Sequence, residues 1–439
     1  MASHGRHVEW TNWAGNESAR LVSIAVPRSE AEVVELVERA ARRGLRVKAL
    51  GAGHSFTRVA ATGGVQVRLG ALTGVTEVDA TRGEVTVRAG TPLHVLNEEL
   101  EILGLAMPNL GDIDRQSLAG ATSTGTHGTG LRLTGLSAGI RALRIVLADG
   151  SVVACSPTEE PELFQAARLG LGALGIITEL TVAVVPAYLL SAHERPERLS
   201  SLLERVDIEF EAHDHFEFFW FPHTDRALSK RNNRVPAGTT REPLSVWRSR
   251  LDDDLLGNKV FELTNRLATT APRTTKPINA IAARALSERR YTDHSHRVFV
   301  TARDVRFVES EWAFPRRALG DVLRELRTWI DSHDEQISFP VECRAAAADD
   351  VWLSTAYERE SCYIAIHRYA RQPRGAYFDA FEAIAMEHGG RPHWGKMHTR
   401  GADWLRATYP RFDDFVAVRD RVDPERRFGN AYLHQVLGS

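Results

Sequence analysis

The stretch Leu45–Ser55, LRVKALGAGHS, decides how the first part of the chain folds. Leu45, Val47 and Ala49 alternate with charged residues, which predicts a half-buried strand, and a glycine loop follows directly at Gly51. Glycines at such a strand end let the backbone approach a phosphate or a ring closely. The loop is no Rossmann fingerprint, because the third glycine is missing and no apolar helix follows. The local sequence alone therefore leaves open whether the loop binds a phosphate or a ring.

Two histidines lie in glycine-rich loops. His54 is either a loop histidine with a structural hydrogen bond or a group that meets a ligand. The second loop, Thr124–Gly130, either binds a pyrophosphate through a nest of backbone N–H groups or is a polar turn. A catalytic zinc needs about three protein ligands, and His127 has no HExxH-type partner pair, so we expect no metal site.

Two helices are predicted around the first glycine loop. A capping box at Ser29 and Glu32 starts one helix, which ends at Gly44. The other begins with Thr91 as N-cap and Pro92 at its first position. The leucines that this second helix is expected to bury are Leu93, Leu96, Leu100 and Leu103.

The next segment, residues 107–130, is dense in Gly, Ser and Thr and shows no sustained period. So long a run inside a compact domain is usually functional, and we expect a loop there. The strands that we expect lie at 65–69, 85–89, 143–147 and 176–185 in the first part, and at 216–221, 339–344 and 362–369 in the second. Segment 235–290 is weakly patterned and carries no assignment.

The length of 439 residues exceeds what one hydrophobic core supports, so we expect two domains. Pro186 marks the boundary. The expected division is 1–186, 187–412 and a C-terminal segment, 413–439, that returns to the first domain. The mixture of helices and sheets makes the predicted fold class α+β.

The composition is that of an ordinary enzyme, with 43% hydrophobic and 26% charged residues and a formal net charge of -2. This balance offers no electrostatic footprint for nucleic acid or an anionic membrane. The three cysteines suggest neither disulfides nor zinc. Since we find no signal peptide and no uninterrupted apolar run of about 18 residues, we expect a cytoplasmic protein without a transmembrane segment.

Four further side chains in the second half are candidates for chemistry. Glu342 and Arg344 share one face of a strand, with Cα atoms roughly 6.5 Å apart, and they either grip one small ligand or form an ion pair. His367 is either an acid or base or a satisfied buried histidine. Lys396, in the run Arg391–Lys396, has the charge needed to stabilise a reacting oxygen or a reduced ring.

Taken in order, these segments resemble the FAD enzymes of the vanillyl-alcohol-oxidase type, specifically the aldonolactone oxidoreductases. That family includes L-gulono-1,4-lactone and D-arabinono-1,4-lactone oxidases, and alditol oxidases share the landmarks. The resemblance covers almost the full length. The motifs that carry it are Asn12–Asn16, the Gly-His-Ser loop, Ser117–Gly130, Leu171–Gly175, Glu342-x-Arg344, His393–Lys396 and Asn430-x-Tyr432.

The resemblance implies a two-domain fold with a PCMH-type FAD-binding domain and a cap domain for the substrate, and it implies FAD attached through His54 to the 8α-methyl carbon of the flavin. The expected cofactor-binding residues are Ala49, Leu50, Gly51, Ala52, Gly53, His54, Ser55, Gly111, Ser117, Gly120, Thr124, Gly125, Thr126, His127, Ile177, His393 and Lys396. The expected substrate contacts are Asp112, Glu342, Arg344, His367 and Lys396.

The resemblance also implies hydride transfer from a carbinol carbon of the lactone to flavin N5, with Arg344 and Lys396 stabilising the developing alkoxide. Ala365 and His367 stand where alditol oxidases carry histidine and threonine, which favours a lactone over a polyol. Gly111 stands where alanine in some relatives is thought to block oxygen, so we expect O₂ as acceptor and hydrogen peroxide as co-product. The alternatives are a polyol oxidase, a dehydrogenase with another acceptor, and an idle flavin-binding protein.

Overall fold

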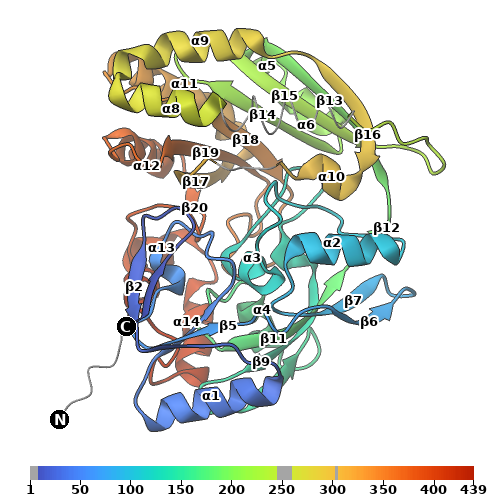
Figure 1. The fold of residues 1–439 in the computed structure, drawn as a ribbon, viewed down its shortest axis with the longest axis vertical. Helices are drawn as coiled ribbons and strands as arrows, with labels where there is room; N and C mark the ends of the chain where they lie inside the picture. The colour runs from blue at the N-terminus through green and yellow to red at the C-terminus, as the bar shows by residue number, and fades with distance from the viewer. Residues whose placement is uncertain (1–7, 245–259, 302–304) are drawn as a thin grey trace.

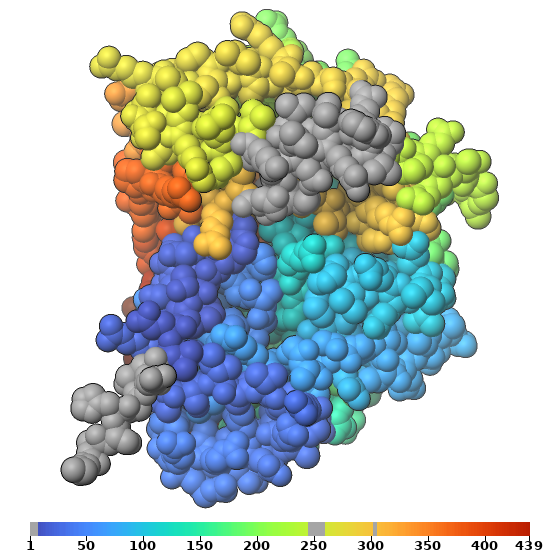
Figure 2. Space-filling view, viewed as in Figure 1, coloured from blue at the N-terminus to red at the C-terminus, as the bar shows by residue number. Residues whose placement is uncertain are grey.

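The computed structural model describes residues 8–244, 260–301 and 305–439 and divides into two layered parts. In Figure 1 the lower part holds the blue to green N-terminal elements, and the upper part holds a large sheet with helices beside it. In Figure 2 the blue and cyan atoms fill the lower half of the visible face. The start of the chain at 1–7 and part of the unassigned segment, 245–259, lie outside the described residues.

The lower part is built on a parallel and an antiparallel sheet. The parallel sheet has the order β3-β5-β4, and the antiparallel one has the order β10-β9-β11-β7-β6. The strands of these two sheets are β3 (Ser23–Ala25), β4 (Val47–Leu50), β5 (Val65–Arg68), β6 (Val75–Asp79), β7 (Glu84–Arg88), β9 (Ile140–Val146), β10 (Val152–Cys155) and β11 (Ile176–Ala183). Two short ribbons are β1 (Val8–Thr11) with β2 (Ser18–Leu21), and β8 (Leu105–Ala106) with β12 (Val185–Pro186).

Helix α1 (Glu30–Arg42) starts where the capping box predicts. The Ser29 hydroxyl accepts a hydrogen bond from the Glu32 N–H at 3.2 Å, which satisfies one orphan donor of the first turn. The reciprocal bond differs, because the Glu32 carboxylate accepts the N–H of Arg28. The helix ends before Gly44, whose φ of +62° suits glycine. The other α-helices of the lower part are α2 (Leu93–Ile102), α3 (Leu118–Thr124), α4 (Pro161–Arg168), α13 (Ala402–Thr408), α14 (Phe412–Val422) and α15 (Ala431–Leu437).

Three local predictions were wrong. The Thr91 hydroxyl does not cap α2, because it donates to the Arg88 carbonyl at 2.6 Å and the helix begins one residue later than expected. Leu103 follows the end of that helix and is 46% exposed. The loop expected over 107–130 contains α3, which the Ser117 hydroxyl caps. Its small side chains pack in the core but show no clear helical period, so the helix was missed.

The upper part is one antiparallel sheet of eight strands, in the order β16-β13-β15-β14-β18-β19-β17-β20. Its strands are β13 (Leu189–Arg198), β14 (His215–Phe221), β15 (Arg226–Arg234), β16 (Arg289–His294), β17 (Phe307–Pro315), β18 (Val341–Ala346), β19 (Ser361–Tyr369) and β20 (Arg391–Pro392). The helices beside it are α5 (Leu199–Leu203), α6 (Val206–Ala212), α8 (Phe261–Thr270), α9 (Thr275–Ala285), α10 (Ser295–Phe299), α11 (Leu319–Ser332) and α12 (Tyr377–Glu387). The α+β fold class is confirmed.

Two large hydrophobic clusters correspond to these parts. The first joins residues from α1, β5 and β11 with side chains of the C-terminal helices, including Phe415 and Leu433. The second lies under the large sheet around Trp220, Trp312 and Phe381. The division at 187 and 413 stays a proposal. Leu405, which precedes 413, already packs in the first cluster, so we propose that the return begins with α13.

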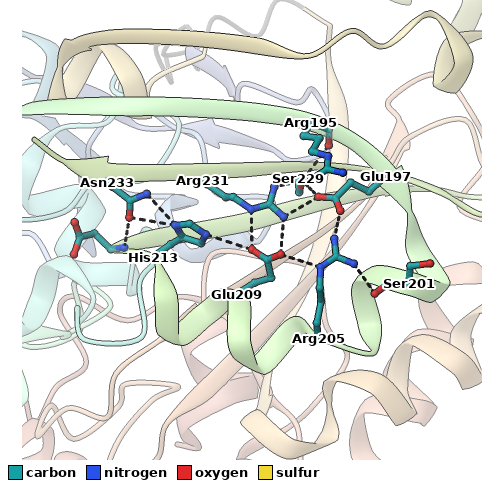
Figure 3. A network of polar contacts seen from close by, with 10 residues as sticks. Arg195, Glu197, Ser201, Arg205, Glu209, His213, Ser229, Arg231 and Asn233 are labelled. Carbon is teal, nitrogen blue, oxygen red and sulfur yellow. Dashed lines mark hydrogen bonds and ion pairs between the residues drawn. The ribbon is translucent and has the colours of Figure 1, made fainter.

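A buried ion-pair network fastens α6 to β13 and β15 (Figure 3). The Arg231 guanidinium donates to the carboxylates of Glu197 and Glu209, each at 2.7 Å. Arg205 contacts the same two carboxylates, and His213 approaches Glu209 at 3.3 Å. The hydrogen bond from the Arg231 guanidinium lowers the pKa of Glu209 to about 2, although burial of the carboxylate acts in the opposite direction. This carboxylate therefore stabilises the fold in its charged form.

We expect Glu209→Gln to lower the free energy of unfolding by about 3 kcal/mol at pH 7, because it leaves buried cations without one partner. The pKa of Glu209 is lower in the folded state, so its contribution is complete above about pH 5 and is lost as the pH falls towards 2. Urea unfolding at pH 7 and at pH 3.5 checks this. The exposed pair Asp321–Arg324 supplies the control Asp321→Asn, expected below about 1 kcal/mol. Equal losses in both variants would contradict the assignment.

Candidate active site

The glycine loop after β4 and helix α3 enclose a cavity of about 360 Å³ in the first part. This volume lies in the range of small-molecule and cofactor sites. Eleven predicted cofactor-binding residues line it, namely Ala49, Leu50, Gly51, Ala52, Gly53, His54, Ser55, Ser117, Gly120, Thr124 and Ile177. The cavity therefore brings together segments more than 100 residues apart in sequence.

Close backbone contacts shape this cavity. A Cβ atom on Gly51 would lie 2.6 Å from the Ser117 hydroxyl and 3.4 Å from the Cα of Gly120. Only glycine allows the loop and α3 to approach this closely. On another wall, the buried Lys48 ammonium donates to the carbonyls of Leu171, Gly172 and Phe428 at 2.9–3.2 Å. Lys48 thus ties the strand to the loop after α4 and to the C-terminal segment.

His54 lies where this cavity meets a second, smaller one, because it lines both. Its ring stacks on Trp13 with centroids 5.3 Å apart. Burial, with the nearby charge of Lys396, lowers the pKa of His54 to about 4, so the imidazole is neutral at physiological pH. Among the described residues, its buried Nδ1 atom finds no hydrogen-bond partner. A neutral imidazole with an orphaned nitrogen fits covalent attachment to a cofactor.

The run His393–Lys396 holds the second part of the chain against the glycine loop. On one side, the N–H of His393 donates to the Glu311 carbonyl and that of Met397 donates to the Glu309 carbonyl, at 3.0 and 2.8 Å. On the other side, the N–H of Phe56 donates to the Gly395 carbonyl at 2.7 Å. The run is therefore hydrogen-bonded both to β17 and to the loop that carries His54.

The smaller cavity is lined by charged side chains from both parts of the chain. Its lining includes the predicted residues Gly111, Asp112, Thr126, His127, Arg344, His393 and Lys396, together with His54, Ser55 and Thr124, which the two cavities share. Gly125, Glu342 and His367 line neither cavity. Substrate contact by Glu342 and His367 stays a prediction.

Arg344 is the cation of this cavity that the structure holds most firmly. Its guanidinium donates to Glu217 at 2.8 Å, contacts Glu342 and lies 3.6 Å from Asp112. Burial disfavours the charge, but the three carboxylates outweigh it and hold the pKa of Arg344 well above its ordinary value. The ion pair that was one alternative for Glu342 and Arg344 thus exists, and it orients an arginine that faces a cavity.

Two acidic residues of β17 contact the charged side chains of this cavity. Glu309 pairs with the Lys396 ammonium at 2.5 Å and lies 3.7 Å from His367 Nε2. Glu311 lies 3.3 Å from His127 Nε2. Although burial raises the pKa of Glu311, the neighbouring imidazoles and Lys396 hold it well below the usual range. The His127 ring stacks on Tyr363 with centroids 3.7 Å apart.

His127, Glu311 and His393 lie close enough together to hold a metal ion, with ligand atoms within 4.8 Å of one another. One nitrogen of each ring has a backbone partner. His127 Nδ1 pairs with the Gly128 carbonyl at 2.9 Å, and His393 Nδ1 accepts the N–H of Gly395 at 3.1 Å. These bonds do not involve the Nε2 atoms, and the absence of a metal site stays a prediction.

Sequence reasoning missed Lys48, Glu217, Glu309 and Glu311. The acidic ones stand among aromatic and branched residues of strands, in FEFFWF and VESEWAF, and an acidic residue in a run that reads as buried is the signal that was available. Three other histidines, His213, His294 and His296, line neither cavity. His213 belongs to the network of Figure 3, and His294 and His296 contact Glu101.

Comparison with known proteins agrees with this arrangement. Residues 180–436 match the family described as D-arabinono-1,4-lactone oxidase, and residues 23–156 match an FAD binding domain. The chain belongs to the D-arabinono-1,4-lactone oxidase family. This membership confirms the resemblance drawn from the motifs, and with it the prediction of an FAD-dependent oxidoreductase.

Relatives of the family match along almost the whole chain. An L-gulono-1,4-lactone dehydrogenase of Mycobacterium tuberculosis (strain ATCC 25618 / H37Rv) is 40% identical over 98% of this chain and 99% of its own. The L-gulonolactone oxidase of Mus musculus is 32% identical over 99% of both chains. An alditol oxidase of Streptomyces sp. is 31% identical over 97% of this chain and 98% of its own.

Solved structures support the fold. A cholesterol oxidase from Brevibacterium sterolicum superposes with a TM-score of 0.82 at 16% identity, covering 98% of this chain and 96% of that one. At this identity the likeness concerns the fold alone, and it confirms the two-domain architecture expected for the family. Within the described ranges, no helix combines the length and the apolar character needed to cross a bilayer.

We expect Gly51→Ala to lose bound flavin, because the new methyl group would lie 2.6 Å from the hydroxyl that caps α3. The ratio of flavin absorbance to protein concentration in the purified variant measures the loss. We expect the affinity for flavin to fall at least about tenfold, which corresponds to about 1.4 kcal/mol of binding free energy. Gly63→Ala is the matched control, since a Cβ there meets nothing within 4 Å. Normal flavin content in Gly51→Ala would refute the assignment of this cavity.

Proposed function

We propose that this protein oxidises a carbinol carbon of an aldono-1,4-lactone with FAD held covalently on His54. The observation that carries the proposal is the placement of Arg344 and Lys396 in a cavity that shares His54 with the larger FAD cavity. The 40% identity to an L-gulono-1,4-lactone dehydrogenase supports a lactone as substrate. When bound, FAD supplies the acceptor for the two electrons of the reaction.

The residues around the smaller cavity have different proposed roles in the reaction. Arg344 and Lys396 present N–H donors to the substrate hydroxyl and stabilise it as the proton leaves. Asp112 lines the same cavity and is placed to take that proton. Glu342 and Glu217 orient Arg344 from behind. Ser117, Gly120 and Thr124 to His127 remain the proposed contacts of the pyrophosphate and the ring.

Oxygen is the proposed electron acceptor, with hydrogen peroxide as product. Gly111 lines the smaller cavity, and a Cβ there would lie 3.2 Å from the His127 carbonyl oxygen, so a side chain would crowd this wall. Peroxide formed per lactone oxidised tests this part. We also propose a reducing, cytoplasmic location, since all three cysteines are buried and free, and cell fractionation tests it.

The covalent link predicts a clear result for His54→Ala. We expect the yellow colour of the wild type to stay with the pellet after acid precipitation and that of His54→Ala to pass to the supernatant. The orphaned Nδ1 atom and the low pKa of the ring are the reasons. His193→Ala, which removes an imidazole paired with Glu288, is the control. Colour that is released equally from all three proteins would reject the link but not the FAD cavity.

We expect Arg344→Ala to keep its flavin and to lose about 10²–10³-fold in kcat, because one donor to the developing alkoxide is removed. Steady-state rates with L-gulono-, L-galactono- and D-arabinono-1,4-lactone measure this effect. Xylitol and sorbitol belong in the same panel. Polyol activity without lactone activity would select the alditol oxidase alternative, and anaerobic flavin bleaching by none of these compounds would select an idle flavin protein. Full activity of Arg344→Ala would refute its role.

A further inference from the structure

Strand β17 places a buried carboxylate directly behind the lysine of the proposed site. The Glu309 side chain is 6% exposed and belongs to the lining of neither cavity. Its carboxylate pairs with the Lys396 ammonium at 2.5 Å. Because Glu309 contacts Lys396 and lines neither cavity, we expect its main influence on the reaction to pass through that lysine.

Glu309 holds the lysine segment by its backbone as well as by its side chain. Its carbonyl accepts the N–H of Met397 at 2.8 Å, one residue after the lysine. On the far side, His367 from β19 lies 3.7 Å from the carboxylate, and its Nδ1 atom pairs with the Pro340 carbonyl at 3.2 Å. The carboxylate thus lies between His367 of β19 and Lys396, which lines the cavity.

The charge of Lys396 depends on its neighbours. Burial disfavours a charged ammonium and lowers the pKa of a lysine, often by several units. In this structure Glu309, then Glu311 and Asp112, outweigh burial and raise the pKa of Lys396 above its ordinary value. Other titratable groups that face the lysine include His54 and His393, whose pKa values burial and Lys396 lower to about 4 and about 3, so they stay neutral; Arg344 and His127 line the same cavity.

We propose that Glu309 is a positioning residue that aims the Lys396 ammonium into the cavity and keeps it protonated there. The role of the Glu309–Lys396 pair in lactone oxidation rests on the proposed function. The competing explanation is a purely structural ion pair between β17 and the run at 393–397. The two explanations differ in whether turnover follows the protonation of Lys396 when the carboxylate is removed.

The chain suits a direct measurement, because it contains only five lysines. Lysine labelled with ¹³C at Cε is incorporated into the FAD-loaded full-length protein, and the Lys396 signal is assigned by its absence in Lys396→Met. In the wild type we expect no titration of this signal below pH 10. In Glu309→Gln we expect its midpoint to fall by at least about 2 pH units, because burial then outweighs the remaining carboxylates Glu311 and Asp112.

Three outcomes would overturn the proposal. They are a wild-type midpoint below pH 9, an unchanged midpoint in Glu309→Gln, and an equal shift in Glu197→Gln, the matched control with a carboxylate of the same 6% exposure in the network of Figure 3. Glu309→Asp keeps the charge and is expected to titrate as the wild type does. It keeps the test open if Glu309→Gln does not fold. These readings need no lactone, so they stand apart from a failure of the proposed function.

Turnover supplies the catalytic readout. With a lactone substrate, we expect kcat of Glu309→Gln to fall about 10²-fold as the pH rises through the lowered pKa of Lys396, because the neutral amine no longer stabilises the alkoxide. The wild type is expected to show no such limb. In a Lys396→Met background, Glu309→Gln is expected to add no further loss, since the two residues act as one unit. Additive losses would instead indicate a structural role.

Discussion

The site depends on the double hydrogen bonding of the run at 393–397. This run pairs with β17 of the large sheet through the carbonyls of Glu309 and Glu311, and its Gly395 carbonyl accepts the N–H of Phe56 in the His54 loop. These are backbone bonds, so they fix positions to within a few tenths of an ångström whatever the side chains are. They bring a lysine of the second part of the chain to the imidazole of the first, and neither part contains the site alone.

The His54 loop and the run at 393–397 also contact residues near both ends of the chain. From the N-terminal side, the amide of Asn12 donates to the Ser55 carbonyl at 3.0 Å. From the C-terminal side, the amide of Asn430 lies 2.9 Å from the Ala61 carbonyl, and the Tyr432 hydroxyl donates to the Trp394 carbonyl at 2.8 Å. Motifs that look unrelated in sequence therefore serve one purpose. They satisfy carbonyls of segment 55–61 and of the run at 393–397, which would otherwise carry a desolvation cost of about 1–3 kcal/mol each.

The sequence predicted several features whose signal is local, although the equally local cap at Thr91 was wrong. The cap at Ser29 and the strand before Gly51 depend on residues within one or two turns and were predicted, but Lys48, expected on the charged face of that strand, is buried. The helix at 118–124 was missed because small side chains leave no amphipathic pattern, although they pack closely against the glycine loop. Glu309 was missed for a different reason. Its partner Lys396 is 87 positions away in the chain, and only the pairing of β17 with the later segment brings the two together.

The charge balance of the site also indicates the charge of the substrate that it favours. Arg344 contacts three carboxylates and Lys396 contacts a fourth, so each cation that faces the cavity is already compensated. An anionic substrate would meet carboxylates in low dielectric without an uncompensated cation to offset the repulsion. A neutral polyhydroxy compound meets the same donors without that cost. The opened aldonate acid carries a negative charge and the closed 1,4-lactone does not, so the arrangement that holds Arg344 and Lys396 in place also favours the lactone over its hydrolysis product.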